Sequence, residues 1–215
     1  MLHRLSTWAL TLAFCVTAII DCASSSEFEV VYPLGAKKIA SDFHSIWGVD
    51  KMRKRDKKHQ GIDITGENND PIIAAADGVV LESVIEKCWG PTIAIDHGKD
   101  IEGKDMIALY GHVGERLVAT GDDVKRGQII AFLGNNHKKF RCISGVRHLH
   151  FQIGRKYRWG FEKGSSWGHS YFLKDGGRGV NPHLHWADGP GQVTCFDPNR
   201  IFEKGSLTYP IPCDN

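Results

Sequence analysis

Three short motifs bring together residue types that can bind a metal ion and activate water. They are one His-x-x-x-Asp, one Tyr-x-His and one His-x-His motif: His59 and Asp63, Tyr110 and His112, and His148 and His150. A catalytic zinc ion takes three protein ligands and keeps a fourth position open for water. Histidine and aspartate are both zinc ligands, and a histidine outside the ligand set can transfer a proton near neutral pH. The motifs therefore predict a zinc-dependent hydrolytic site.

The spacing inside the motifs favours β-strands as the elements that position them. Successive side chains of a strand point to opposite faces, so His148 and His150 share one face and Leu149 points into the core. His59 and Asp63 are four residues apart, which places them on one face of either a strand or a helix. A glycine and several β-branched residues in and after this stretch disfavour a helix. We therefore interpret the stretch as a strand or the edge of one.

The order of these motifs resembles that of the lysostaphin/LytM-type zinc metalloendopeptidases, a family of peptidoglycan hydrolases. The flanking segments are similar as well. Residues 72–81 resemble the strand that follows the family's first motif, and residues 121–130 resemble the hairpin before its last motif. A single His-x-His motif would be weak evidence, because most histidines are not ligands. All the motifs occur here in the family's order, over roughly residues 30–155, and this combination is specific.

The resemblance implies a role for each of the five histidine and aspartate positions. Three of them are the expected ligands of one zinc ion per chain: His59, Asp63 and His150. The other two, His112 and His148, are the expected catalytic residues beside the open coordination position. An unligated histidine can accept the proton of the zinc-bound water or stabilise the developing oxyanion. The sequence does not decide which of the two histidines is the base.

Three other residues are candidates for substrate contacts: Tyr110, His183 and His185. Tyr110 is either a core aromatic residue or a hydrogen-bonding group near the substrate. His183 and His185 form a second His-x-His pair, which could bind metal by residue type and spacing. Turn signals surround this pair, whereas His150 lies in a run of alternating residues. We expect the second pair to form loop structure beside the cleft or to contact the substrate.

The resemblance implies a secreted enzyme that hydrolyses the peptide cross-links of bacterial peptidoglycan. Glycyl-glycine bridges and D-alanyl–diaminopimelate cross-links both fit a shallow groove. One alternative is a catalytically silent LytM-like regulator that activates a cell-wall amidase. Such regulators usually lack ligand residues, and this chain retains all five positions. The other alternative is a secreted zinc-containing binding protein with an occluded groove, and residues 156–190 could supply the occluding loop.

The composition is that of one globular domain without a nucleic-acid signature. The chain has 215 residues, of which 41% are hydrophobic, and this is enough for one core. Its 27 basic and 25 acidic residues give a net charge of +2, without the basic stripe that nucleic-acid binding requires. A basic cluster at residues 51–58 is either a solvated loop or a surface that attracts an anionic cell-wall polymer. We expect a monomer that acts on peptidoglycan stem peptides and cross-bridges.

Residues 1–24 have the features of a signal peptide. Arg4 precedes an uncharged apolar run at residues 8–20, which is too short to span a bilayer comfortably. Small residues suitable for cleavage follow at positions 23–26. Cys22 allows a lipoprotein as the alternative, but Asp21 is a poor match to the small residue expected before a lipid-modified cysteine. We expect a secreted or periplasmic protein with no transmembrane segment after removal of the signal.

Four cysteines lie downstream of this segment, namely Cys88, Cys142, Cys195 and Cys213. In an exported chain they suggest two disulfides, for which three connectivities exist. We favour Cys195–Cys213, because it would fasten the C-terminal tail, and this leaves Cys88–Cys142 as the second disulfide.

The alternation of short β-prone runs with glycine and aspartate turns predicts a mainly β fold. Strands are expected at residues 28–32, 92–97, 106–110 and 128–133. We predict a single antiparallel β-sandwich or incomplete barrel with the zinc site in an open groove. Residues 25–155 would form this LytM-like core, and residues 156–215 would form a loop-rich extension packed on it.

Overall fold

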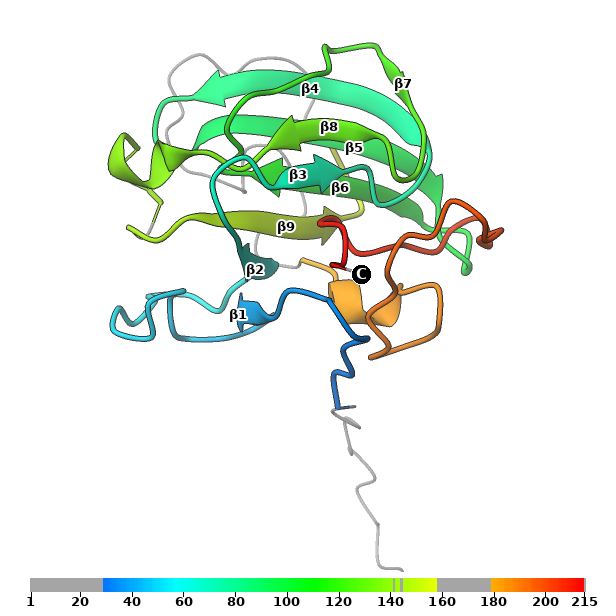
Figure 1. The fold of residues 1–215 in the computed structure, drawn as a ribbon, viewed down its shortest axis with the longest axis horizontal. Coiled ribbons are helices and arrows are strands. Elements are labelled where there is room, and N and C mark those ends of the chain that lie inside the picture. The colour runs from blue at the N-terminus through cyan, green and yellow to red at the C-terminus, as the bar shows by residue number, and fades with distance from the viewer. Residues whose placement is uncertain (1–28, 141, 144, 158–178, 215) are drawn as a thin grey trace, which may run out of the picture.

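The computed structural model describes residues 29–140, 142–143, 145–157 and 179–214 (Figure 1). The predicted signal peptide, the start of the strand predicted at residues 28–32, and residues 158–178 of the C-terminal extension lie outside this part. No helix within the described ranges is long and apolar enough to cross a membrane.

Two antiparallel sheets form the fold of the described residues. The larger sheet has seven strands, which follow one another across the sheet in the order β1 (Ile39–Ser41), β2 (Ile62–Thr65), β9 (His148–Gly154), β6 (Asp105–Gly111), β5 (Gly90–Lys99), β4 (Gly78–Glu86) and β7 (Asp123–Val124). The smaller sheet pairs β3 (Pro71–Ile73) with β8 (Ile129–Phe132). The described connections contain the short 3-10 helices η1 (Asn135–Lys138) and η2 (Pro182–Leu184). The prediction of a mainly β fold, an antiparallel β-sandwich or incomplete barrel, is confirmed for the described residues.

Residues from both sheets share one hydrophobic core. β3 and β8 lie across the face of the larger sheet, and their Ile72 and Ile130 belong to the same buried cluster as residues of β5, β6 and β9 (Figure 1). From β9 the cluster includes Leu149, Phe151 and Ile153, so the predicted inward direction of Leu149 is confirmed. The alternate residues of this strand are therefore left for the opposite face, where the candidate site lies.

The segment predicted as one strand at residues 72–81 contributes to two strands in different sheets. β3 ends at Ile73 and β4 begins at Gly78, and the three alanines between them are buried. The Ala74 N–H donates to the Gln128 carbonyl at 2.9 Å, and the Gly127 N–H donates to the Ala74 carbonyl at 2.9 Å. Residues 121–130 are consequently not a hairpin, because β7 pairs with β4 and β8 pairs with β3. The small alanine side chains let the chain pass from one sheet to the other. In the sequence these alanines are part of a continuous apolar run, so the change of sheet could not be recognised there.

The described part of the C-terminal extension is loop-rich and adds to the core. Trp186, Leu207 and Tyr209 are members of the main buried cluster. The structure contains the disulfides Cys195–Cys213 and Cys88–Cys142, so the favoured connectivity is confirmed. The first of these fastens the C-terminal tail as expected, and the second ties the loop after η1 to the turn between β4 and β5.

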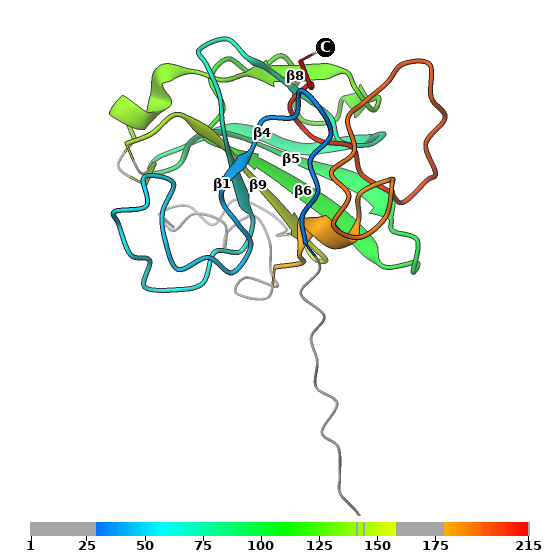
Figure 2. The same cartoon turned by 60° about the horizontal axis from the view of Figure 1, so that its bottom comes forward.

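The extension also contacts the N-terminal segment. Figures 1 and 2 show η2 beside this segment at one edge of the larger sheet. The Val31 N–H donates to the Gly191 carbonyl at 2.9 Å, and the Val193 N–H donates to the Val31 carbonyl at 3.0 Å. The strand predicted at residues 28–32 is thus reduced, in its described part, to a single bridge between Val31 and Gln192.

Candidate metal centre

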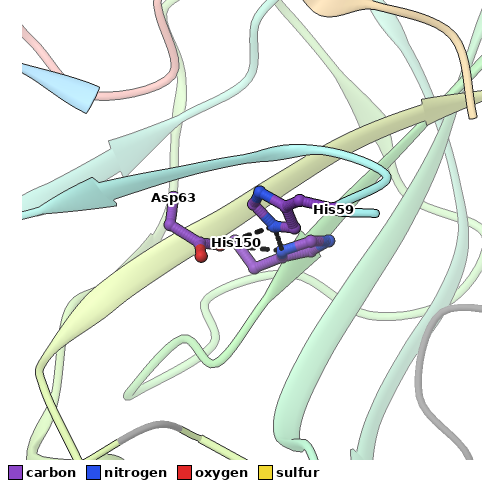
Figure 3. Close-up of side chains that lie close together, drawn as sticks. All are labelled: His59, Asp63 and His150. Atoms are coloured by element: carbon purple, nitrogen blue, oxygen red, sulfur yellow. Dashed lines mark hydrogen bonds and ion pairs between the residues drawn. The ribbon is translucent and has the colours of Figure 1, made fainter. Parts of the chain in front are cut away.

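The pairing of β2 with β9 places two of the predicted ligands opposite each other. Asp63 on β2 is the cross-strand partner of His150 on β9, and Thr65 is the partner of His148. Directly opposed residues of an antiparallel pair project to the same face, so both ligands leave the sheet on one side. His59 lies three residues before β2 and completes the group (Figure 3). The stretch interpreted as a strand or strand edge therefore has Asp63 inside the strand and His59 in the loop before it.

Three potential ligand atoms converge on one point. His59 Nε2 lies 3.1 Å from Asp63 Oδ1 and 3.0 Å from His150 Nδ1, and the last two atoms are 2.9 Å apart. Zinc bonds of about 2.0–2.1 Å in tetrahedral geometry separate neighbouring ligands by about 3.3 Å. The three side chains are buried, with exposures of 4%, 1% and 4% for His59, Asp63 and His150. The residues present therefore fit a zinc ion after a movement of a few tenths of an ångström.

Hydrogen bonds to surrounding groups fix which atom each ligand presents. His59 Nδ1 donates to the Asp42 carbonyl at 3.0 Å, which leaves the Nε2 lone pair for a metal. His150 Nε2 donates to Gln152 Oε1 at 3.2 Å, which leaves Nδ1. The Arg55 guanidinium donates to Asp63 Oδ2 at 2.6 Å, which leaves Oδ1. Such outer contacts orient metal ligands and set their tautomers.

The electrostatics of the group favour the protonation states that bind metal. Burial alone would raise the pKa of Asp63, but His59, His148 and His150 hold this pKa well below its ordinary value. Burial lowers the pKa of His150, and Asp63 opposes this shift without cancelling it. An ionised carboxylate and a neutral imidazole are the forms that coordinate a divalent cation.

The predicted catalytic pair lies beside these ligands. His112 follows β6, and its Nδ1 donates to the Trp89 carbonyl at 2.9 Å. His148 Nδ1 donates to the Val146 carbonyl at 2.7 Å, and the two ring centroids are 4.9 Å apart. Both rings therefore keep Nε2 as the atom available for proton transfer.

His112 also has an unusual backbone and a perturbed pKa. Its φ of 65° lies in the left-handed region, which non-glycine residues seldom adopt and which is often found at functional sites. Burial lowers the pKa of His112 well below its ordinary value, and His148 and His150 lower it further. The ring is consequently neutral near pH 7 and able to accept a proton.

One cavity of about 200 Å³ brings the five residues together. Its other lining residues are Arg55, Lys57, Lys58, Gln60, Trp89 and Cys142. The Trp89 ring packs against His112 and His150, with centroid distances of 4.7 Å and 4.9 Å. Arg55 and Trp89 were not predicted from the sequence. The available signals were the position of Arg55 in the basic cluster at residues 51–58 and that of Trp89 beside Cys88.

The three predicted substrate contacts do not line this cavity. Tyr110 is 0% exposed, and its hydroxyl accepts from the Ala75 N–H at 2.9 Å and lies 3.0 Å from His97 Nε2. Burial lowers the pKa of His97 to about 4, so the two side chains form a neutral core pair. These contacts place Tyr110 in the core, which was one of its two predicted roles.

The second His-x-His pair lies outside the active-site cavity. The Trp186 indole N–H donates to His183 Nδ1 at 3.0 Å, and His183 Nε2 donates to Asp42 Oδ1 at 2.9 Å. Because the Asp42 carbonyl accepts from His59, His183 supports a residue that supports a ligand. Both ring nitrogens of His185 are buried and have no hydrogen-bond partner among the described residues.

Comparisons with known proteins agree with the motifs. Residues 57–161 match the model of Peptidase family M23. The chain is similar to the peptidoglycan DD-endopeptidase ShyC of Vibrio cholerae, with 33% identity over 126 residues that cover 56% of this chain and 25% of ShyC. It is also similar to the murein hydrolase activator NlpD of Escherichia coli, with 36% identity over 99 residues that cover 46% of this chain and 23% of NlpD.

Among solved structures, the catalytic domain of lysostaphin from Staphylococcus simulans matches with a TM-score of 0.45 and 22% identity, over 57% of this chain and 84% of that domain. The chain spans only about a quarter of the length of ShyC and NlpD. The matched segment contains all five histidine and aspartate positions of the site, and residues 57–161 therefore form a domain of peptidase family M23, the LytM-type family that the motifs resemble.

Proposed function

We propose that this protein is a zinc metalloendopeptidase that hydrolyses peptide cross-links of bacterial peptidoglycan. The observation that carries the proposal is the complete set of ligand and proton-transfer groups around one small cavity. The relative ShyC, a peptidoglycan DD-endopeptidase, supports the substrate class. Secretion or export to a periplasm belongs to the same proposal, because peptidoglycan lies outside the cytoplasmic membrane.

The three ligands would hold the zinc ion that acts as the Lewis acid of the reaction. A zinc ion bound by His59, Asp63 and His150 would polarise the scissile carbonyl and lower the pKa of a bound water to about 7. Asp63 contributes its negative charge, and Arg55 keeps the second oxygen of this carboxylate turned away from the ligand position. The two imidazoles are held by their outer hydrogen bonds, so little reorganisation is needed on metal binding.

His112 is the residue best suited to accept the proton of the attacking water. Its pKa is depressed and its Nε2 carries the lone pair, because Nδ1–H is committed to the Trp89 carbonyl. Once protonated, the ring can pass the proton to the leaving amine. We assign stabilisation of the developing oxyanion to His148, which is held beside His112 by the Val146 carbonyl.

A regulator without catalytic activity is the second candidate, because the relative NlpD is a murein hydrolase activator. Such a protein would bind a partner enzyme and would need neither a metal nor a base. The retention of all five positions, each with an oriented side chain, favours the hydrolase.

The test is to measure zinc per chain and the release of muropeptide fragments on the same oxidised sample, with and without a chelator. We expect one zinc per chain and release that the chelator abolishes. His112→Ala should keep its zinc and lose about 10²- to 10⁴-fold in turnover, the usual contribution of general base catalysis. Stoichiometric zinc without cleavage would support a binding role, and absence of both would support the regulator.

A further inference from the structure

A second cavity, of about 630 Å³, opens next to the candidate active site. It is lined by Lys37, Lys38, Thr65, Gly66, Glu67, His137, Gly145, Val146 and Arg147. Thr65 is the cross-strand partner of His148, and the Val146 carbonyl accepts the hydrogen bond from His148 Nδ1. The cavity therefore begins at residues that directly contact or flank a proposed catalytic histidine. A peptide that extends from the scissile bond along this end of β2 and β9 would enter it.

The lining of this cavity is mainly cationic. Three basic side chains line the cavity together with one carboxylate, Glu67: Lys37, Lys38 and Arg147. Lys37 pairs with Asp70 at 3.1 Å, whereas Lys38 is exposed and has no ion pair among the described residues. Glu67 lies 3.5 Å from Arg147, but its side chain is 87% exposed, so it screens the guanidinium only weakly.

Hydrogen-bonding capacity in the same place is unused. Nε of Arg147 is buried without a partner among the described residues, while its terminal nitrogens contact Asn135 and Glu67. Nδ1 of His137 is likewise buried and makes no hydrogen bond of standard geometry within the described residues. Burial lowers the pKa of His137, and the neighbouring Arg147 and Lys138 lower it further. The surroundings of this ring are thus positive, as a site for an anion requires.

We propose that this cavity, which we call the basic subsite, binds a carboxylate of the peptide substrate next to the scissile bond. Guanidinium and ammonium groups are the side chains that recognise carboxylates, and their charge-assisted hydrogen bonds are about twice as strong as neutral ones. The inference rests on the proposed function and narrows its substrate class to acidic cross-links, as opposed to uncharged glycine bridges. The cations Arg55, Lys57 and Lys58 around the active-site cavity act in the same direction.

The experiment uses two quenched fluorescent peptides that differ in one group. One carries a free carboxylate on the residue next to the scissile bond, and the other carries the carboxamide. The zinc-loaded wild-type protein should cleave the acid with a kcat/KM about tenfold or more above that of the amide, the ratio expected for one charge-assisted hydrogen bond. The difference should lie mainly in KM, because the carboxylate does not take part in bond cleavage.

Variants then assign this preference to the cavity. The double variant Lys38→Gln, Arg147→Gln should lose the preference for the acid and retain its turnover of the amide. Lys156→Gln removes one positive charge from an exposed residue outside both cavities and should behave like the wild type. Equal kcat/KM for the two peptides in the wild type, or a preference that survives in the double variant, would overturn the proposal.

A binding measurement separates this proposal from the proposed function. Calorimetry with non-cleavable versions of the same acid and amide peptides reports the subsite even if nothing is hydrolysed. Tighter binding of the acid, lost in the double variant, would support the basic subsite in a protein that does not cleave peptides. Equal binding of both peptides would reject the subsite whatever the activity.

Discussion

The two His-x-His pairs of this chain have the same residue types and the same spacing, yet they have different surroundings. His148 and His150 lie in β9, where the i and i+2 side chains share a face and where β2 brings Asp63 opposite His150. His183 lies in η2 and His185 caps its C-terminal end. A 3-10 helix has three residues per turn, so side chains two residues apart leave its axis about 120° apart.

This difference shows that the spacing of a His-x-His pair indicates a metal site only when the secondary structure around it directs both side chains to the same face. His183 is directed to Asp42, whereas His185 lies near the charges of Arg155 and Asp100. Neither belongs to a group of three potential metal ligands within the described residues. The first pair forms part of a site because two strands place further ligand types opposite it.

The largest expected effect is the loss of zinc binding when a histidine of the first pair is removed, compared with removal of a histidine of the second pair. His150→Ala removes one of three converging ligand atoms and should abolish stoichiometric zinc binding, with a loss of activity of at least about 10³-fold. His185→Ala removes an imidazole of the same spacing and should keep both zinc and activity. Zinc content after dialysis and fragment release measure the two effects. If His185→Ala lost its zinc, the assignment of ligands to the first pair alone would be wrong.

Much of this contrast could be predicted from the sequence. The alternation of His148, Leu149 and His150 within a β-prone run indicated a strand with one polar and one core face. The turn signals around His183 and His185 indicated an irregular segment. The pairing of Cys195 with Cys213 followed from the need to fasten a C-terminal tail, and the structure contains this disulfide.

The parts that could not be predicted depend on long-range contacts. Arg55 reaches Asp63 because its loop folds back through bonds from the Arg55 N–H to the Ile46 carbonyl at 2.8 Å and from the His59 N–H to the Ser45 carbonyl at 3.1 Å. Asp42 supports His59 through its backbone carbonyl, which every residue type possesses. No side-chain pattern can report a contact of that kind.

A smaller effect is expected from the group that orients Asp63. Arg55→Lys keeps the positive charge but loses the planar fork that donates to Asp63 Oδ2, so zinc affinity should fall about tenfold. Competition with a chromogenic chelator measures the change. The matched control is Lys57→Arg, which exchanges the same two residue types in the same cavity and should leave the affinity unchanged. An Arg55→Lys variant with wild-type affinity would show that this hydrogen bond does not position the ligand.

The smallest expected effects are changes in stability on substituting His183 or His185, the two members of the second pair. His183→Ala leaves the buried Trp186 N–H without its acceptor and removes one of two hydrogen bonds to the half-exposed Asp42 carboxylate, so it should lower the free energy of unfolding by about 1–3 kcal/mol. His185→Leu removes two buried nitrogens that have no partner among the described residues, so it should be neutral or stabilise by up to about 1 kcal/mol.

Urea unfolding at a fixed zinc excess measures both variants of this pair. Burial would raise the pKa of Asp42, but the hydrogen bond from His183 helps to hold it below its ordinary value. The stabilisation that this carboxylate provides is therefore complete above about pH 4 and is lost as the pH falls through the lowered native pKa. The difference in the free energy of unfolding between wild type and His183→Ala should become smaller as the pH falls through that range. A constant difference would mean that His183 contributes only through packing and its hydrogen bond with Trp186, and the second pair would then have no electrostatic connection to the residue that holds His59.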